Sequence, residues 1–297
     1  MKVCAVVVSY YPKADALRAL VERLRAQGAG VLVVDNTPPP ASAPLAPGAD
    51  VIRLGGNRGI AAAHNRGIDE ALAGGCSHVL LMDQDSEPAD DMLARLLAAE
   101  RRLLAAGRRV AAVAPLFEEP RQGVTSHFIR LDGWRVRKLR CERGDERLMA
   151  DYVISSGSLI RAEVLRALGG MDEALFIDYV DIEWGLRALA RGYRCYGVCD
   201  ARMRHQLGDP PAGLPFSRRK RYPVHSPLRH YYHFRNALSL YRRDYVSLAW
   251  KLNDAWRLVL KFGFYSLMTP PRHEHLRMML LGLWHGLRGR GGALRPG

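Results

Sequence analysis

The sequence predicts an α/β fold in which helices cover both faces of a mostly parallel central sheet. Short apolar segments alternate with amphipathic segments of helical length through the first half of the chain, as in repeated βαβ units. One apolar run ends in two acids, Asp83 and Asp85, as expected at the carboxyl edge of such a sheet. The 297 residues are 48% hydrophobic, which is enough for a sizeable core.

The first elements follow one another as strand, helix, strand and strand. Val3–Ser9 is an apolar run and predicts a buried strand. Ala14–Gln27 has apolar residues at helical spacing, and Val31–Val34 predicts a second strand. A proline-rich loop at residues 38–47 precedes a short strand at Val51–Leu54.

The pattern then repeats. Ile60–Ala73 predicts a helix and Val79–Met82 a strand. Ala89–Ala106 predicts a helix with Pro88 at its start, and Val110–Ala114 predicts another strand. Later helices are expected at residues 162–168, 184–190, 245–268 and 275–287. Because composition changes near Pro210, we expect a catalytic domain at residues 1–215 and a helical extension at residues 216–297.

Composition narrows the classes of function. The formal net charge of +14 at pH 7 suits nucleic acid, an anionic membrane or a phosphorylated substrate. Dispersed arginines without interleaved aromatic residues argue against nucleic acid. The five cysteines form no CxxC pair and no even disulfide set, and the N-terminus shows no signal peptide, so we expect a reducing cytoplasm. The first strand precedes Ser9-Tyr10-Tyr11-Pro12 and not G-x-G-x-x-G, which excludes a dinucleotide-binding oxidoreductase.

The acid pair is the strongest candidate site. Asp83 and Asp85 could hold Mg²⁺ or Mn²⁺, which take few protein carboxylates and fill other positions with water and phosphate oxygens. The alternative is that both acids cap the helix near Pro88. Asp35 follows the second strand and could accept the N–H of a pyrimidine base, or form an ordinary turn. The glycine-bearing segment 55–67 could bring N–H groups and Arg58 to a phosphate, or only begin a helix.

Several motifs together resemble one known family. VVVSYYP, VVDNT, GNRGIAAAHNRG and LLMDQDSEP, in this order, are similar to the inverting family-2 glycosyltransferases of the GT-A fold. The fit is best with bacterial rhamnosyltransferases, and it extends to ISSGSLI, MDEALFIDYVDIEWGLR and YYHFRN. The resemblance implies a GT-A fold, a nucleotide-sugar donor, a divalent metal and a hydroxyl acceptor.

The resemblance also implies roles for individual residues. Asp181 matches the catalytic base, and the metal ligands would be Asp83, Asp85 and His205. The acceptor would be oriented by Asp178, Glu183 and Trp184. The donor and its nucleotide would be bound by Ser9, Tyr11, Asp35, Asn57, Arg58, Asn65, Asp83, Gln84 and Gly157. The alternative is that the acids at 178, 181 and 183 only cap a helix, and that His205 is solvated.

The reaction that the resemblance implies is transfer of L-rhamnose from dTDP-β-L-rhamnose to a hydroxyl of a bacterial surface glycan or glycolipid, such as lipopolysaccharide core or O-antigen. A UDP-furanose or another deoxysugar donor is the near alternative. An aspartate-based phosphotransferase is the distant one, because its D-x-D motif normally follows the first strand.

The C-terminal extension predicts a surface function. Charged residues Lys251, Asp254, Arg257 and Lys261 interrupt Val246–Leu267, so this helix suits an interface better than a bilayer span. We expect peripheral contact with the inner face of the cytoplasmic membrane. The basic run at residues 218–221 could strengthen this contact, or it could instead bind the diphosphate of the donor. The same helices could pack on the catalytic domain or on a second copy in a homo-oligomer.

Overall fold

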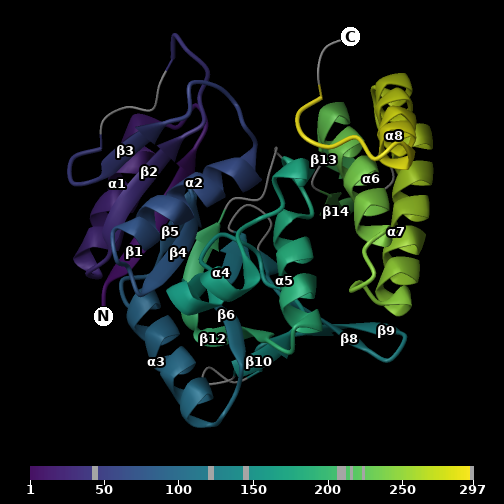
Figure 1. The fold of residues 1–297 in the computed structure, drawn as a ribbon. Coiled ribbons are helices and arrows are strands. Elements are labelled where there is room, and N and C mark those ends of the chain that lie inside the picture. Colours follow the sequence, from purple (N-terminus) through teal and green to yellow (C-terminus); the bar gives the residue numbers. More distant parts are fainter. Residues whose placement is uncertain are drawn as a thin grey trace.

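The computed structural model describes residues 1–41, 46–119, 124–142, 147–205, 212–214, 217–222 and 225–294. For residues 119, 124, 205, 212–214 and 217–222 it describes the backbone alone. Within these ranges a large mixed sheet lies between layers of helices, and three C-terminal helices pack beside it (Figure 1). The expected basic run at residues 218–221 has its side chains outside the described residues.

One half of the sheet is parallel, as expected. Its strands are β1 (Val3–Ser9), β2 (Gly30–Asp35), β3 (Asp50–Arg53) and β4 (His78–Asp83). Ser9 pairs with Asp35 and Val8 pairs with Asp83, so these strands end at one edge of the sheet. The polar residues that follow them therefore meet there.

Alternation along β1 decides which helices cover each face. Val3, Ala5 and Val7 pack with α1 (Ala14–Ala26) and α3 (Met92–Ala105). Neighbouring residues of β1 point to the opposite face and pack with α2 (Ile60–Ala73), α4 (Ala162–Leu168) and α5 (Val180–Ala190). The alternation therefore builds two hydrophobic cores, one on each side of the sheet.

One expected helix start is wrong. Ser86–Pro88 forms a short strand, β5, which pairs antiparallel with the end of β12 (Arg194–His205), and α3 begins only at Met92. The proline suits an edge position in this short ladder because it lacks a donor. The acid pair therefore lies in a tight connection between two strands and does not cap a helix.

The second half of the sheet is mixed. β11 (Leu159–Arg161) runs antiparallel to β4, while β12 runs parallel to β6 (Val110–Glu119). The remaining elements before α4 and α5 are β7 (Val124–Thr125), the hairpin of β8 (Phe128–Asp132) and β9 (Arg135–Leu139), and β10 (Arg147–Ala150). A 3₁₀ turn, Glu173–Leu175, leads from α4 toward α5.

The C-terminal extension shares the core of the catalytic part. A small hairpin of β13 (Ala212–Leu214) and β14 (Ser217–Tyr222) is followed by α6 (Pro227–Tyr241), α7 (Leu248–Leu267) and α8 (Arg272–Leu287). Phe234 of α6 and Trp250 of α7 lie in the same cluster as Trp184 of α5. Of the alternatives for these helices, the structure therefore shows packing on the catalytic domain. No helix in the described part of the chain is long and apolar enough to cross a bilayer.

The cysteine prediction requires a correction. Cys141, after β9, forms a disulfide with Cys199 of β12, with a Cα–Cα distance of 5.6 Å. Cys4, Cys76 and Cys195 are free and buried. The two cysteines are 58 residues apart and the chain has an odd number of cysteines, so the sequence alone did not indicate this pair.

Candidate active site

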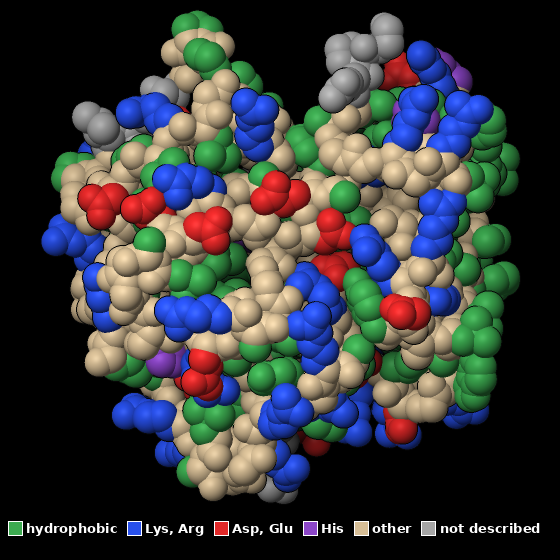
Figure 2. Space-filling view, viewed as in Figure 1, with side chains coloured by type: hydrophobic (Ala, Val, Ile, Leu, Met, Phe, Trp, Pro, Cys, Tyr) green, Lys and Arg blue, Asp and Glu red, His purple; other side chains and the backbone are tan. Residues whose placement is uncertain are grey.

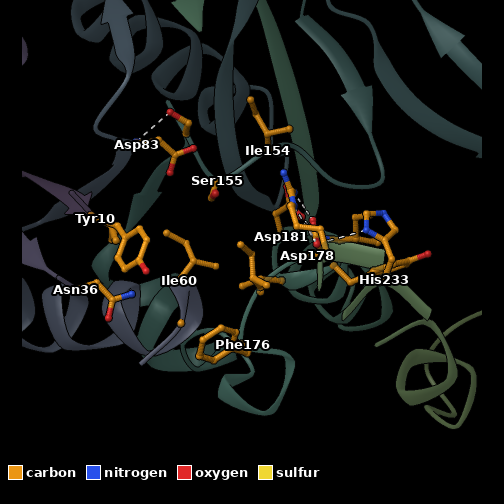
Figure 3. Close-up of a pocket in the computed structure, with 18 of the residues that line it drawn as sticks. Tyr10, Asn36, Ile60, Asp83, Ile154, Ser155, Phe176, Asp178, Asp181 and His233 are labelled. Atoms are coloured by element: carbon orange, nitrogen blue, oxygen red, sulfur yellow. Dashed lines mark hydrogen bonds and ion pairs between the residues drawn. The ribbon is translucent and has the colours of Figure 1, made fainter. Parts of the chain in front are cut away.

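A cavity of about 580 Å³ opens at the carboxyl edge of the parallel strands. It separates the end of β4 from the start of α5, and Figure 3 shows Asp83 on one side and Asp178 and Asp181 on the other. The polar and charged lining residues are Tyr10, Asn36, Asn57, Asp83, Gln84, Asp85, Ser155, Ser156, Asp178, Tyr179, Asp181, Arg229, His233 and Arg257. The structure thus brings both predicted acidic clusters into one cavity.

The acid pair is held by contacts on both sides of it. The backbone N–H of Asp83 donates to the Ser156 hydroxyl at 3.1 Å. The side-chain amide of Gln84 bonds twice to the backbone of Tyr10, accepting from its N–H at 2.6 Å and donating to its carbonyl at 3.0 Å. Gln84, an expected donor-binding residue, thus also ties the acid loop to the end of β1.

The donor set at this loop fits a small hard cation. Asp83 and Asp85 both line the cavity, and Mg²⁺ or Mn²⁺ needs only one or two carboxylates when phosphate oxygens and water complete the shell. Among the described side chains, no three His, Cys, Asp or Glu residues gather as a complete protein metal site. The backbone of His205 pairs with Ser86 beside this loop, but its side chain lies outside the described residues.

Asp178 and Asp181 differ in their electrostatic surroundings. Burial disfavours the charged form of Asp178, but His233 and Arg229 hold the pKa of its carboxyl well below its usual range. Burial raises the pKa of Asp181 to about 6, and the negative charges of Asp178 and Asp83 act in the same direction. The carboxyl of Asp178 is therefore ionised at neutral pH, whereas Asp181 can accept a proton near neutral pH.

Glu183 and Trp184, expected to orient the acceptor, lie behind the cavity and do not line it. Glu183 is 1% exposed and accepts from Arg187 Nε at 2.8 Å and from Tyr245 Oη at 2.5 Å. The Trp184 indole N–H donates to the carbonyl of Gly169 at 3.0 Å. Both side chains fix α5 in place through these contacts.

The expected base-binding residue Asp35 is also buried. Its carboxylate, 1% exposed, accepts from the Ser9 hydroxyl at 3.4 Å and the Thr37 N–H at 3.1 Å. The neighbouring Asn36 lines the cavity instead and donates to Asn57 Oδ1 at 3.1 Å. The sequence pattern pointed to Asp35, whereas the side chain that reaches the cavity is that of Asn36.

Tyr11 and Arg58, also expected to bind the donor, have exposed side chains and do not line the cavity. Tyr11 has φ of 47° and its N–H donates to the Thr37 hydroxyl at 3.0 Å. The N–H of Arg58 donates to Asn36 Oδ1 at 2.7 Å. Both residues shape the rim around Asn36.

The start of α2 differs from the expected phosphate cradle. The N–H of Ile60 donates to the carbonyl of Phe176 at 2.8 Å, so a protein acceptor occupies this helix end. Gly59, with φ of 87°, packs so closely that a Cβ there would lie 2.5 Å from the Phe176 ring. The glycine is therefore explained by helix packing.

Two further expected donor-binding residues make structural contacts. Asn65 donates to the Met171 carbonyl at 2.9 Å and accepts from the Met171 N–H at 2.7 Å. A Cβ on Gly157 would lie 2.6 Å from the Pro115 ring, and its φ of +84° also favours glycine. Neither residue lines the cavity, whereas Ser155 and Ser156 of the same segment do.

Residues of α6 and α7 complete the cavity and were not predicted. Arg229 and His233 flank Asp178, and Arg257 of α7 bonds to Asp254 at 2.7 Å. The segment Tyr231–Asn236 resembles a family motif, but the resemblance gives its residues no role. His233 and Asn236 are three residues apart, which places them on one face of α6, and this spacing is the signal in the sequence that points to them.

The architecture and the cavity together define a glycosyltransferase of the GT-A fold. Solved structures with this fold include S. aureus TarS 1–349 in complex with UDP-GlcNAc, with a TM-score of 0.58 and 15% identity, covering 98% of this chain and 82% of that chain. GalNAc-T7 with UDP, GalNAc and Mn²⁺ has a TM-score of 0.56 and 15% identity, covering 90% and 56%.

The sequence comparisons assign the family. The model described as Glycosyl transferase family 2 matches residues 5–168, and the chain belongs to this family. It is 32% identical over 296 residues to the dTDP-rhamnosyl transferase RfbF of Shigella flexneri, covering 96% of this chain and 95% of that protein. The predicted family and fold are thus confirmed, and the phosphotransferase alternative is wrong.

Proposed function

We propose that this glycosyltransferase moves L-rhamnose from dTDP-β-L-rhamnose to a hydroxyl of a bacterial surface glycan or glycolipid, with inversion. The observation that supports the reaction is the single cavity lined by Asp83 and Asp85 on one side and by Asp181 on the other. The similarity to a dTDP-rhamnosyl transferase along nearly the whole chain supports the donor.

Asp181 is the base in this proposal. Its carboxylate accepts the proton of the acceptor hydroxyl while the hydroxyl oxygen forms a bond to the anomeric carbon. The bond between that carbon and the diphosphate oxygen breaks on the opposite face, so a β-linked donor gives an α-linked product. Asp178 stays ionised and helps to hold the proton on Asp181, because its negative charge raises the pKa of that residue.

Asp83 and Asp85 would hold Mg²⁺ or Mn²⁺, with His205 as a further proposed ligand. When bound, the cation supplies positive charge that stabilises the departing diphosphate. The chain itself positions this loop through Ser156 and Gln84. Asn57 and Asn36 line the cavity on the β2 side, where we place the nucleotide; Ser9, Asp35, Tyr11 and Arg58 would support or border it.

We further propose that the C-terminal helices bring the enzyme to the inner face of the cytoplasmic membrane. Large apolar side chains are exposed on α7 and α8: Leu248, Leu252, Trp256, Val259, Leu260, Leu267, Leu280, Trp284 and Leu287. Figure 2 shows hydrophobic side chains along the right-hand edge of the molecule, over these helices, with Lys and Arg side chains nearby. This combination suits an anionic lipid surface and an acceptor presented there.

A donor panel tests the proposed donor. The purified chain is incubated with Mn²⁺ or Mg²⁺ and either dTDP-β-L-rhamnose, dTDP-glucose, UDP-galactofuranose or UDP-GlcNAc. Released nucleoside diphosphate and the shift in melting temperature are both measured. We expect the largest stabilisation and turnover with dTDP-β-L-rhamnose. Turnover of a UDP-sugar alone would contradict the proposed donor and favour the near alternative.

A further inference from the structure

Apolar side chains line the part of the cavity that separates the two acid groups. Ile60, at the start of α2, and Ile154, before β11, both face into it and are partly exposed. In Figure 3, Ile154 lies above Asp181 and Ile60 lies below Asp83, with Ser155 between the two acids. The other apolar members of this wall are Phe176, Ile177, Val180 and Ile182.

Both isoleucines have fixed positions relative to the reacting groups. Ile154 is two residues before Ser156, whose hydroxyl accepts from the Asp83 N–H and lies 2.7 Å from the Ser86 hydroxyl. The Ile60 backbone is tied to the Phe176 carbonyl at 2.8 Å, in the loop that leads to Asp181. The wall is therefore anchored at both ends of the cavity.

The chemistry of transfer places the donor sugar against this wall. The diphosphate must lie at the acid pair, and the acceptor hydroxyl must lie within reach of Asp181, so the sugar ring occupies the interval between them. Asp83 and Asp181 line the same cavity, and Ile60 and Ile154 line it with them. A sugar held there contacts Ile60 and Ile154.

Isoleucine side chains offer no hydrogen bond, so a sugar hydroxyl placed against them loses water on that side without gaining a partner. A methyl group at the same place has no hydrogen bond to lose and gains apolar contact. Resting on the proposed function, we propose that Ile60 and Ile154 contact the C6 methyl of the donor and select 6-deoxyhexosyl donors over their 6-hydroxy counterparts. These residues act on specificity and not on the chemical step.

The matched donors are dTDP-β-L-rhamnose and dTDP-β-L-mannose, which differ by one hydroxyl on C6. We expect the wild-type kcat/KM, measured as released dTDP, to favour the deoxy donor about 10- to 100-fold, the range for a hydrophobic pocket that meets an added hydroxyl. Ile154→Thr and Ile60→Thr place a hydroxyl in the wall and should reduce that ratio at least about fivefold. Ile154→Val and Ile60→Val introduce valine, which has the shape of threonine but no hydroxyl. These two variants should therefore leave the ratio unchanged.

The outcomes separate this inference from the proposed function. A wild-type ratio near one, or a ratio unchanged in both threonine variants, would overturn the inference while leaving rhamnosyl transfer intact. Failure of the wild-type chain to turn over dTDP-β-L-rhamnose would overturn the proposed function first. The affinity of each variant for dTDP alone, which lacks the sugar, shows whether the variant is folded, and two positions are tested so that one unfolded variant does not decide the result.

Discussion

The side-chain nitrogen of Asn236 on α6 lies 2.9 Å from the backbone carbonyl oxygen of Asp178. The same amide group donates to the carbonyls of Leu175 at 2.9 Å and Ile177 at 2.7 Å. Arg235, 1% exposed, adds a bond to the Leu175 carbonyl at 2.8 Å. The C-terminal extension thus holds the backbone of the loop that precedes the candidate base.

That loop requires external support because its backbone is strained. Phe176, Asp178 and Tyr179 have φ of 65°, 63° and 66°, in the left-handed region that side chains other than glycine rarely adopt. Each such residue costs about 1–3 kcal/mol. The contacts from Asn236 and Arg235 offset this cost, and Asp181 follows directly at the start of α5.

Asn236→Ala should therefore reduce both stability and turnover. Removal of the amide takes a donor from the carbonyls of Ile177 and Asp178, while the Leu175 carbonyl keeps its bond from Arg235, at a cost of about 1–3 kcal/mol. We expect a lower melting temperature and a kcat reduced at least tenfold, with little change in affinity for dTDP, because the nucleotide side of the cavity is formed by other elements. Asn253→Ala is the control, since Asn253 bonds to the Trp134 carbonyl on the hairpin, away from this loop. Equal effects of both substitutions on kcat would contradict the role of Asn236 in holding the loop before Asp181.

Asp181→Asn tests the assignment of the base. The amide keeps the size of the side chain but cannot accept the proton of the acceptor. We expect a fall in kcat of at least 100-fold, with dTDP-sugar affinity within about threefold of wild type. Glu183→Gln is a useful comparison, because Glu183 bonds to Arg187 and Tyr245 behind the cavity and should change stability more than chemistry. Transfer at the wild-type rate by Asp181→Asn would eliminate the proposed base.

The pKa of Asp181 also predicts how the rate depends on pH. Burial raises this pKa to about 6, above the ordinary value of an aspartate. The base is the ionised form, so kcat/KM should be constant above about pH 7 and should fall as pH drops through 6, approaching tenfold per pH unit. A donor-saturated rate profile between pH 4.5 and 8.5 measures the effect. A plateau that continued down to pH 4.5 would exclude a base with a raised pKa.

The parallel half of the fold was predictable because each strand there is a continuous apolar run between helical patterns. β1, β2, β4, α1 and α2 lie within a few residues of the expected bounds. The error at β5 has a local cause: Pro88 followed by two acids is also the pattern of a helix start, and only the pairing with β12 makes it a strand. A short edge strand carries too few residues for periodicity to decide.

The site was predictable to a more limited extent. The acids at 83, 85, 178 and 181 do line one cavity. Their places in the sequence motifs and the order of the strands were enough to predict this. Arg229, His233 and Arg257 were missed because they reach the cavity only through packing of α6 and α7 on the catalytic part. Asn65 and Gly157 were named from motifs, although their contacts with Met171 and Pro115 depend on tertiary neighbours.

Replacement of the acid loop ligands tests the proposed metal dependence. Asp85→Asn removes one negative charge from the cavity without changing side-chain size. We expect loss of the increase in melting temperature that Mn²⁺ and dTDP give together, and a fall in turnover of at least 100-fold. Treatment of the wild-type chain with EDTA should give the same loss, restored by added Mn²⁺ or Mg²⁺. Full turnover in EDTA would show that the acids act without a cation.

The exposed face of α7 and α8 predicts binding to anionic vesicles. Truncation before α7 is an unsuitable test, because Arg257 lines the cavity and Asp254 accepts from the Tyr179 hydroxyl at 2.8 Å. Trp256 and Leu260 are 64% and 56% exposed and can be changed without loss of these contacts.

Burial of each of these two side chains in lipid contributes up to about 1.5–3 kcal/mol. Trp256→Ser with Leu260→Ser should therefore reduce flotation with phosphatidylglycerol vesicles at least tenfold, while donor hydrolysis in solution stays near wild type. Leu228→Ser, which changes an exposed apolar residue at the start of α6, should float normally. Equal flotation of all three chains would show that α7 and α8 do not form the membrane contact, and a change from dimer to monomer in the double variant would assign this face to a second copy of the chain.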